Sequence, residues 1–322
     1  MIMIWPKVCI SILNWNRYEL TIRCLEALAT LDYPNYFIVV VDNASTDASI
    51  ERIRAAFPDV FIIQSETNLG YAGGNELALN YALADAGTDL FWILNNDARP
   101  DPQTLTTLVK VYQQVGDAIY GGVALTSDSL PGSWRLNMPL RNISLRLQLR
   151  FGRDTHGKPF DAYFPTRQPR IVDYVAGSCF MIPLPVVRKH GFMETSFFLY
   201  AEEDDYCARM RREGVPTVLV PEAVVYHIGG ASGESQGPLH PIIAYYRARN
   251  YIIFSRRHRG WVMTVLTSIR HFISIALMFA QGLVGQNDDA KVAHYRLLGL
   301  RDGLLDRMGK TYAPEDFLPK SS

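Results

Sequence analysis

The stretch FIVVVDNASTD (residues 37–47) places five apolar residues directly before a cluster of Asp, Asn, Ser and Thr. Five residues are too few for a helix, and the run shows no polar alternation, which favours a strand buried on both faces of a parallel sheet. The Ser and Asp that follow are residue types that begin helices. The stretch therefore predicts a strand, a polar turn and a helix in succession.

The same pattern recurs along the first hundred or so residues. Further apolar runs that predict strands lie at 8–13, 60–63 and 90–94, and helical spacing occupies 18–31, 75–84 and a stretch from near Pro102. This alternation predicts an α/β fold with an open, mostly parallel sheet flanked by helices. Ligands bind such sheets beyond the carboxyl ends of the strands, so we expect the polar turns 14–16, 42–47 and 95–97 to share one cleft.

The composition is that of an ordinary globular protein, with 322 residues of which 48% are hydrophobic and 20% charged. Lys and Arg total 32, as do Asp and Glu, so no overall charge favours nucleic acid as a partner. Four widely spaced cysteines in apolar contexts indicate reduced core residues of a cytosolic protein: Cys9, Cys24, Cys179 and Cys207. The first residues, MIMIWPKVCISILNWN, predict a strand and no signal peptide, because they lack a charged segment and a cleavage site.

Two polar clusters are candidates for binding a diphosphate and its cation. Asp97 follows an apolar strand, where a carboxylate can hold a hard divalent cation, although Asn95-Asn96-Asp97 also suits a plain turn. The stretch 68–75 has three glycines before a helix, which would let the backbone approach an anion closely. It is neither the dinucleotide fingerprint nor a Walker loop, and glycine-rich loops are common. Asp42 is ambiguous in the same way, since its surroundings also suit a helix start.

An acidic run and one histidine are candidates for proton transfer and ligand binding. Glu202, Glu203, Asp204 and Asp205 follow an aromatic run, and crowding of the four acids would raise the pKa of at least one toward the range of a general base. The run equally suits an ordinary helix N-terminus, where the dipole favours acids. His227 follows a short apolar strand, and both a structural role and a metal or phosphate role stay open.

Taken together and in order, eight stretches closely resemble the family-two glycosyltransferases with the A-type (GT-A) fold, particularly their rhamnosyltransferase-like branch. The stretches are VCISILNWNRYELTIRCLEAL (8–28), VVVDNASTDAS (39–49), NLGYAGGNE (68–76), FWILNNDARPDPQTL (91–105), VAGSCFMI (175–182), FFLYAEEDDYCARMRREG (197–214), VVYHIGGAS (224–232) and RARNYIIFSRRH (247–258). The resemblance implies a GT-A catalytic domain over residues 1–235, with a donor half to about 125 and an acceptor half from about 126. A C-terminal helical region over 236–322 would follow.

The resemblance also implies roles for individual residues. A nucleoside-diphosphate sugar donor would be bound by Asn14, Asn16, Asp42, Asn43, Asn68, Gly70, Gly74, Asn75 and Asn96. Asp97 matches the last carboxylate of the D-x-D-type metal motif, whose first position is Asn95 here, and would hold Mg²⁺ or Mn²⁺, with His227 as a further metal candidate. Glu203 stands where the family's base usually is Asp, and the choice among Glu203, Glu202 and Asp204 stays open.

The resemblance implies a transfer with inversion. A single transfer is expected because neither the Q-x-x-R-W motif nor the several membrane spans of the family's processive synthases are found. The leading expectation is rhamnose from dTDP-rhamnose, moved to a hydroxyl of a glycan or lipid-linked acceptor in cell-surface polysaccharide synthesis. Two alternatives stay open. One is a sugar nucleotidyltransferase, whose usual N-terminal G-x-G-x-R-L loop is missing, and the other is a nucleotide-sugar-binding protein without turnover.

The most hydrophobic stretch, 261–285, is interrupted by Arg270 and His271. Its charge-free part, 272–280, is far shorter than the about 20 residues that a membrane span needs. An arginine-rich lead-in, 256–259, precedes it. We therefore expect a helix that lies in a membrane interface, peripheral on the inner face of the cytoplasmic membrane, or one that is buried in the core or in a homodimer.

Overall fold

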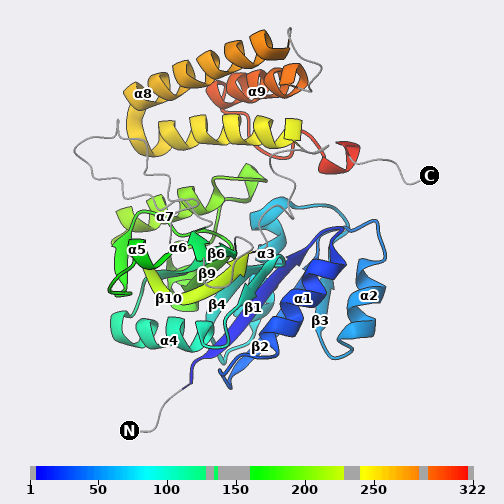
Figure 1. Cartoon of the computed structure of the whole chain (residues 1–322), viewed down its shortest axis with the longest axis vertical. Helices are drawn as coiled ribbons and strands as arrows, with labels where there is room; N and C mark the ends of the chain where they lie inside the picture. Colours follow the sequence, from blue (N-terminus) through cyan, green and yellow to red (C-terminus); the bar gives the residue numbers. More distant parts are fainter. Residues whose placement is uncertain (1–4, 128–133, 137–159, 228–239, 283–288, 318–322) are drawn as a thin grey trace. The chain divides into compact units, whose positions relative to one another are not determined.

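The four apolar runs in the first hundred residues form parallel neighbours in one sheet in the computed structural model of the chain (Figure 1). They are β1 Lys7–Asn14, β2 Tyr36–Asp42, β3 Phe61–Gln64 and β4 Thr88–Asn95. The register pairs Asn14 with Asp42, and Leu13 with Asn95. The polar residues that end these strands therefore lie at one edge of the sheet, as the sequence predicted.

The structure describes residues 5–127, 134–136, 160–227, 240–282 and 289–317. The chain divides into two compact units. Unit 1 comprises Met1–Asn68, Gly74–Phe192 and Tyr206–Gly229, and unit 2 comprises Leu69–Gly73, Met193–Asp205 and Gly230–Ser322. Each unit is described by itself.

Helices follow the strands of unit 1 in the order expected of an α/β fold. They are α1 Tyr18–Leu28, α2 Ser49–Ala56, α3 Gly70–Ala84 and α4 Thr104–Val115. Helix α3 begins at Gly70, whereas the sequence predicted a loop as far as Gly74. A Cβ on Gly74 would lie 2.4 Å from Leu13 Cδ1, so the absent side chain lets helix and strand pack closely. Sequence alone does not distinguish such a packing glycine from one that approaches a phosphate.

Beyond β4 the sheet is mixed, in the order β3-β2-β1-β4-β9-β6-β10-β5. Strand β9 Cys179–Pro183 runs antiparallel to both β4 and β6 Ile119–Ser127, and β10 Thr217–His227 runs parallel to β6. The shorter strands are β5 Ala98–Pro100, β7 Trp134–Leu136 and β8 Arg170–Val172. The remaining helices of this part are α5 Phe160–Tyr163, α6 Leu184–His190 and α7 Glu202–Arg212. Strand direction is not encoded in an apolar run, which is why the antiparallel β9 was not foreseen.

The core of unit 1 lies on both faces of this sheet. Ile10 and Trp92 are fully buried on one face, and Cys9 and Phe91 are fully buried on the other, as the uninterrupted apolar runs require. All four cysteines are buried with free thiols, in agreement with the sequence analysis.

Unit 2 contains two long helices, α8 His240–Gly282 and α9 Asp289–Leu304. Helix α8 bends at Gly260, whose φ of 80° is outside the helical range, and its two halves run in opposite directions beside α9 (Figure 1). Two short 3₁₀ turns, Thr195–Phe197 and Pro314–Phe317, also belong to this unit, as do the first turns of α3 and α7. The helices pack through a small apolar cluster of Ile252, Ile275, Ala293 and Leu300.

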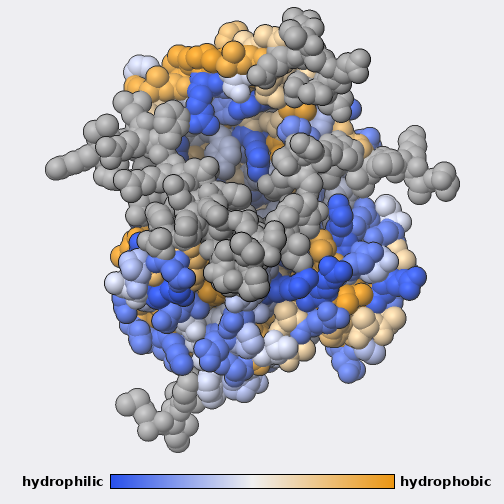
Figure 2. Space-filling model, viewed as in Figure 1, coloured by the Kyte–Doolittle hydropathy of each residue, from blue (hydrophilic) through white to orange (hydrophobic). Residues whose placement is uncertain are grey.

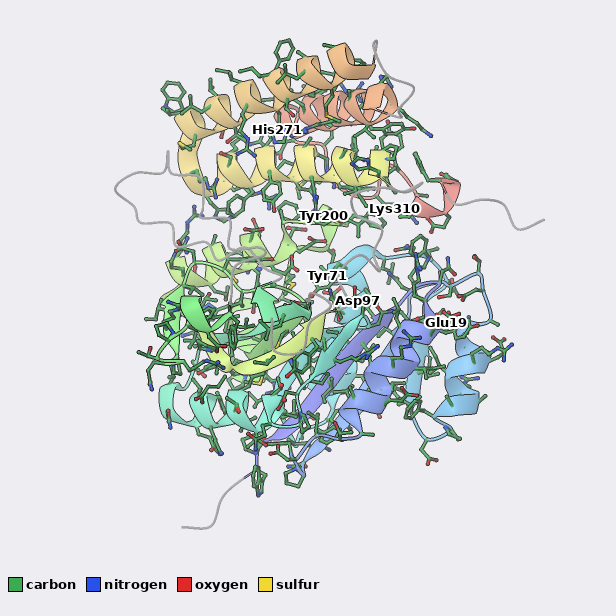
Figure 3. All side chains as sticks on the ribbon, viewed as in Figure 1. Glu19, Tyr71, Asp97, Tyr200, His271 and Lys310 are labelled. Atoms are coloured by element: carbon green, nitrogen blue, oxygen red, sulfur yellow. The ribbon has the colours of Figure 1, made fainter. Side chains whose placement is uncertain are left out.

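A buried histidine lies between the two halves of α8 (Figure 3). Its Nδ1 accepts a hydrogen bond of 3.3 Å from Arg296 Nε, which requires that nitrogen to be unprotonated. Burial, together with the charges of Arg296 and Arg270, lowers the pKa of His271 to about 4. The ring is therefore neutral at physiological pH.

Candidate functional site

The ends of β1 and β2 are joined by buried polar side chains. Asn14 Nδ2 donates to Asp42 Oδ1 at 2.9 Å and to Ser45 Oγ at 3.1 Å, and both Asn14 and Asp42 are fully buried. The second carboxylate oxygen of Asp42 accepts the backbone N–H of Ser45 at 3.0 Å. Buried polar groups that satisfy one another in this way hold a fixed geometry.

The same hydrogen bonds extend to the end of β4. Asn14 Oδ1 accepts from Thr21 Oγ1 at 2.7 Å, and Thr21 Oγ1 in turn accepts from Asn96 Nδ2 at 3.1 Å. Helix α1 thus supplies Thr21 as the link between the strand ends. We call the connected residues the strand-end network: Asn14, Asn16, Thr21, Asp42, Ser45 and Asn96. Thr21 could not be singled out from the sequence, because a threonine in a helix carries no signal of its own.

Asn16 completes the network from the turn after β1. Its backbone N–H donates to Ser45 Oγ at 2.9 Å, and its side-chain oxygen accepts the N–H of Thr46 at 2.7 Å. Asn16 has a φ of 52° and Ala44 a φ of 63°, a left-handed conformation that costs about 1–2 kcal/mol for a residue with a side chain. The hydrogen bonds of the network hold these turns in place.

The residues of the glycine-rich stretch that were predicted to bind the sugar donor contact different parts of the structure. Asn43 Nδ2 donates to Asn68 Oδ1 at 3.1 Å, which attaches that stretch to the end of β2. Asn75 Oδ1 accepts from Ser11 Oγ at 2.8 Å. Gly70 belongs to unit 2, where a Cβ would lie 2.1 Å from the Phe198 carbonyl oxygen. Asn43, Asn68 and Asn75 are thus fixed by side-chain hydrogen bonds, whereas Gly70 and Gly74 fill positions that admit no side chain.

The two candidate metal ligands are brought together by strand pairing. Asp97 follows β4 and is only 7% exposed (Figure 3). Strand β5 pairs antiparallel with β10 so that His227 stands opposite Ala98, one residue from Asp97. The side chain of His227 lies outside the described residues.

Among the described residues, no group of three or more His, Cys, Asp or Glu side chains forms a metal cluster. A single buried carboxylate nevertheless fits Mg²⁺ or Mn²⁺, because such ions are commonly held by one or two carboxylates together with substrate phosphates and water. Asp97 therefore suits a cation that binds together with a diphosphate.

The four acids form the first turn of α7, within unit 2. Burial raises the pKa of Glu202 well above its usual range, and the charge of Glu203 adds to this effect. Asp205 Oδ1 lies 2.7 Å from His258 Nε2, and Asp204 accepts from the Tyr251 hydroxyl at 3.4 Å. Glu203 is the acid of the four that is not buried.

The segment before these acids is held by two buried side chains of α8. Arg249 Nη2 donates to the Phe197 carbonyl at 2.7 Å. Asn250 Nδ2 lies within hydrogen-bond distance of three carbonyls, those of Phe197, Leu199 and Tyr200, at 3.0, 2.7 and 2.9 Å. We call Arg249 and Asn250 the carbonyl clamp. The stretch RARN at 247–250 had no predicted role, although an arginine inside an apolar helix is a signal in itself.

The clamp holds an unusual backbone. Phe198, Tyr200 and Ala201 have φ angles of 69°, 68° and 72°, which residues with side chains rarely adopt. Such strain persists only where the surroundings impose it, and it is concentrated at functional sites. The clamp therefore positions the first turn of α7.

A cavity of about 860 Å³ in unit 1 does not coincide with the strand-end network. Its lining includes Tyr36 and Phe37, which begin β2, whereas Asp42 ends the same strand. We do not assign this cavity to donor binding.

Comparison with known proteins fits this geometry. Residues 9–187, more than half of the chain, match the model of glycosyl transferase family 2. The chain belongs to this family. The mannosyltransferase PcManGT from Pyrobaculum calidifontis, solved with GDP-Man and Mn²⁺, is similar with a TM-score of 0.57 at 16% identity, over 95% of this chain and 89% of that one. The predicted α/β fold of the GT-A type is therefore confirmed, as is the class of enzyme at the level of the family.

Curated relatives of this family 2 chain carry different sugar names. The low-salt glycan biosynthesis hexosyltransferase Agl10 of Haloferax volcanii is 30% identical over 180 residues, 55% of this chain. This match spans about half, 54%, of the relative's length. The N-acetylglucosaminyl-diphospho-decaprenol L-rhamnosyltransferase of Mycobacterium tuberculosis is 26% identical over 74% of this chain and 81% of that protein. The transferred sugar stays a prediction.

The family match contains the strand-end network and Asp97 but ends before the acids of α7. His227 and the carbonyl clamp also lie beyond it. The roles of these later residues therefore rest on their geometry and on the order of the motifs.

Proposed function

We propose that the protein transfers one sugar, with inversion, from a nucleoside-diphosphate donor to a hydroxyl group of a glycan or lipid-linked acceptor. The observation that carries this proposal is the strand-end network, a preorganised set of hydrogen-bonded polar side chains where three parallel strands end. Ligands bind α/β sheets at this edge.

Within the network Asp42 is the residue that recognises the nucleoside. Its two oxygens accept from Asn14 and from the Ser45 backbone, and a carboxylate has capacity for further donors such as ribose hydroxyls or a base N–H. Asn16 and Asn43 flank it. The sugar-diphosphate side would be lined by the remaining donor residues, Asn68, Gly70, Gly74, Asn75 and Asn96.

Asp97 and His227 are the proposed holders of the divalent cation. When bound, the cation neutralises the diphosphate that leaves from the anomeric carbon. The pairing of His227 with the residue after Asp97 supports this assignment.

Glu203 is the proposed base that takes the proton of the acceptor hydroxyl. It is the acid of the four that is not buried, and burial favours the protonated form of Glu202. The attacking oxygen forms its bond to the anomeric carbon while the bond to the diphosphate breaks on the opposite face, and Glu203 retains the proton. One displacement of this kind inverts the configuration.

The finer assignments rest on the resemblance and on the relatives. We propose rhamnose from dTDP-rhamnose as the first donor to test, and an acceptor in cell-surface polysaccharide synthesis. The catalytic domain would extend over residues 1–235, and the enzyme would work in the cytoplasm, at the inner face of the cytoplasmic membrane. The choice of rhamnose and of a lipid-linked acceptor is supported by the name of the mycobacterial relative, an L-rhamnosyltransferase with a decaprenol-linked acceptor.

The test measures thermal stabilisation by nucleoside diphosphates and their sugars, with and without Mn²⁺. A ligand at a hundred times its dissociation constant adds about 2.7 kcal/mol of stability. We expect a Mn²⁺-dependent shift that is lost in Asp97→Asn and retained in Asp59→Asn, an exposed carboxylate outside the network. Glu203→Gln is expected to keep the shift and lose turnover.

Two results would contradict the proposal. One is the absence of a shift with every nucleoside diphosphate. The other is release of pyrophosphate from a sugar phosphate and a nucleoside triphosphate, which would identify a nucleotidyltransferase.

A further inference from the structure

The second half of α8 exposes a continuous apolar face (Figure 2). Its large side chains range from 42% exposed for Leu266 to 77% for Trp261. We call the following eight residues the apolar face: Trp261, Val262, Val265, Leu266, Ile269, Phe272, Ile273 and Leu277. At 3.6 residues per turn they fall within a sector of about 160°, and they extend over about 24 Å of helix.

The opposite side of this helix packs against α9 with both polar and apolar side chains. Thr264, His271 and Ile275 are buried. Ser274 accepts from Arg296 Nη1 of α9 at 3.0 Å. Apolar side chains thus lie on the solvent side of this helix as well as on its buried side, and an exposed apolar patch of this size marks an interaction surface.

The charges around the apolar face have one sign. No Asp or Glu occurs between Glu234 and Asp288, whereas α8 carries six arginines. Arg249 is fully buried in the carbonyl clamp, and Arg256 and Arg257 form ion pairs with Asp306 and Asp205. Arg259 and Arg270 are the two that lie nearest to the apolar face along the chain. Arg270 is exposed and borders the apolar face on the helical wheel, and Arg259 precedes Trp261 by two residues. A helix with an apolar face, basic edges and an aromatic end has the composition of one that lies in an anionic lipid interface.

A second copy of the chain fits the face less well. In a symmetric antiparallel pair the middle of the segment 261–280 meets itself, which brings Arg270 against its own copy. In a symmetric parallel pair the arginine cluster 256–259 meets its own copy instead. Both arrangements oppose like charges, at Arg270 in the antiparallel pair and at Arg259 in the parallel pair, because Arg256 and Arg257 already pair with Asp306 and Asp205.

A membrane span also fits poorly. By length and composition α8 is the described helix that could cross a membrane. The bend at Gly260 divides it, however, and the apolar half is packed against α9, which carries Arg296, Arg301 and Asp302. Spanning would carry these charged groups into the bilayer, where they are costly.

We infer that the apolar face docks on an anionic membrane surface, with the second half of α8 lying in the plane of the interface. The inference deepens the proposed function, because it rests on a lipid-linked acceptor being presented at such a surface. The docking itself needs no turnover and is measured without it.

The test is sedimentation of the full chain with vesicles, in low salt. One vesicle is phosphatidylcholine alone, and the other has phosphatidylglycerol as one lipid in three, since anionic lipid attracts basic segments. We expect binding to the anionic vesicle. Phe272→Glu with Leu277→Glu should lower the partition coefficient at least about tenfold, given the free energy of burying such side chains.

The matched control is Ile171→Glu, which makes the same kind of change at a side chain 71% exposed on β8, in unit 1. It should bind as the unaltered chain does. Arg270→Gln should lower binding to the anionic vesicle about fivefold and leave binding to phosphatidylcholine unchanged. Unchanged thermal melting of the double variant shows that it is folded.

Three outcomes would overturn the inference. They are no sedimentation with the anionic vesicle, equal binding by the double variant, and a dimer in solution that the double variant converts to a monomer while no vesicle binds. If the unaltered chain binds nucleotide but no vesicle, the inference about membrane docking is refuted and the proposed function is not. If the chain binds the anionic vesicle but no nucleotide, the proposed function is refuted and the inference about membrane docking is not.

Discussion

Replacing Asn250 by alanine is expected to loosen the segment that precedes the acids of α7. One amide nitrogen has two hydrogens, and it lies 2.7–3.0 Å from three carbonyl oxygens, so it supplies two good hydrogen bonds shared among three acceptors. The Phe197 carbonyl keeps Arg249 as a donor, whereas the Leu199 and Tyr200 carbonyls lose this amide donor.

The expected cost follows from those two carbonyls. The hydrogen bonds to the Leu199 and Tyr200 carbonyls are only partly buried, so losing the amide donor costs about 0.5–1.5 kcal/mol at each, or roughly 1–3 kcal/mol together. The strained φ angles at Phe198, Tyr200 and Ala201 would relax in the same event. Local opening of the segment 197–205 should become roughly five-fold to 150-fold more frequent.

Hydrogen exchange of peptides that cover 197–205 measures this opening directly. Asn250→Ala should lose protection there, while the strands of unit 1 keep theirs. Asn80→Ala, an exposed asparagine on α3, is the control and should exchange like the unaltered chain. Unchanged protection of 197–205 in Asn250→Ala would refute the role given to the carbonyl clamp.

The remaining predictions concern pH and packing. The pKa of His271 is about 4 in the folded chain and near 6.5 when unfolded, so the free energy of unfolding should fall as pH drops from 6.5 toward 4. His271→Gln should flatten that part of a denaturation series, and an unchanged slope would contradict the assignment. Because burial raises the pKa of Glu202, stability should fall as pH rises above the usual carboxyl pKa, and Glu202→Gln should be the more stable form at neutral pH. Gly122→Ala would place a Cβ 2.4 Å from the Ala223 carbonyl oxygen and should cost about 1–3 kcal/mol, while Gly87→Ala, with no atom closer than 3.8 Å, should leave the melting temperature unchanged.

The early part of the fold could be predicted from the sequence because its information is local. The uninterrupted run at 37–41 and its counterparts at 8–13 and 90–94 identify buried parallel strands, since only both-face burial favours such runs. Parallel strands necessarily end at a common edge, so the meeting of the polar turns followed as well. The enzyme class came from the order of the motifs, which the family match bears out.

Other features were decided only by tertiary structure, because they depend on residues far apart in the chain. The pairing of β10 with β5 sets His227 opposite Ala98, across more than a hundred residues, and no local pattern encodes that register. The glycines at 70 and 74 suggested a loop, but close packing against Phe198 and Leu13 makes them part of a helix.

The role of α8 shows the same limit. The hydrophobicity of the stretch 261–285 predicted a helix but did not show which face of that helix is buried. The contacts of His271 and Ser274 with α9 turn the polar side inward and leave Trp261 and Phe272 exposed. A sequence sets how many apolar side chains a helix carries, whereas the partner against which the helix packs decides which of them meet solvent.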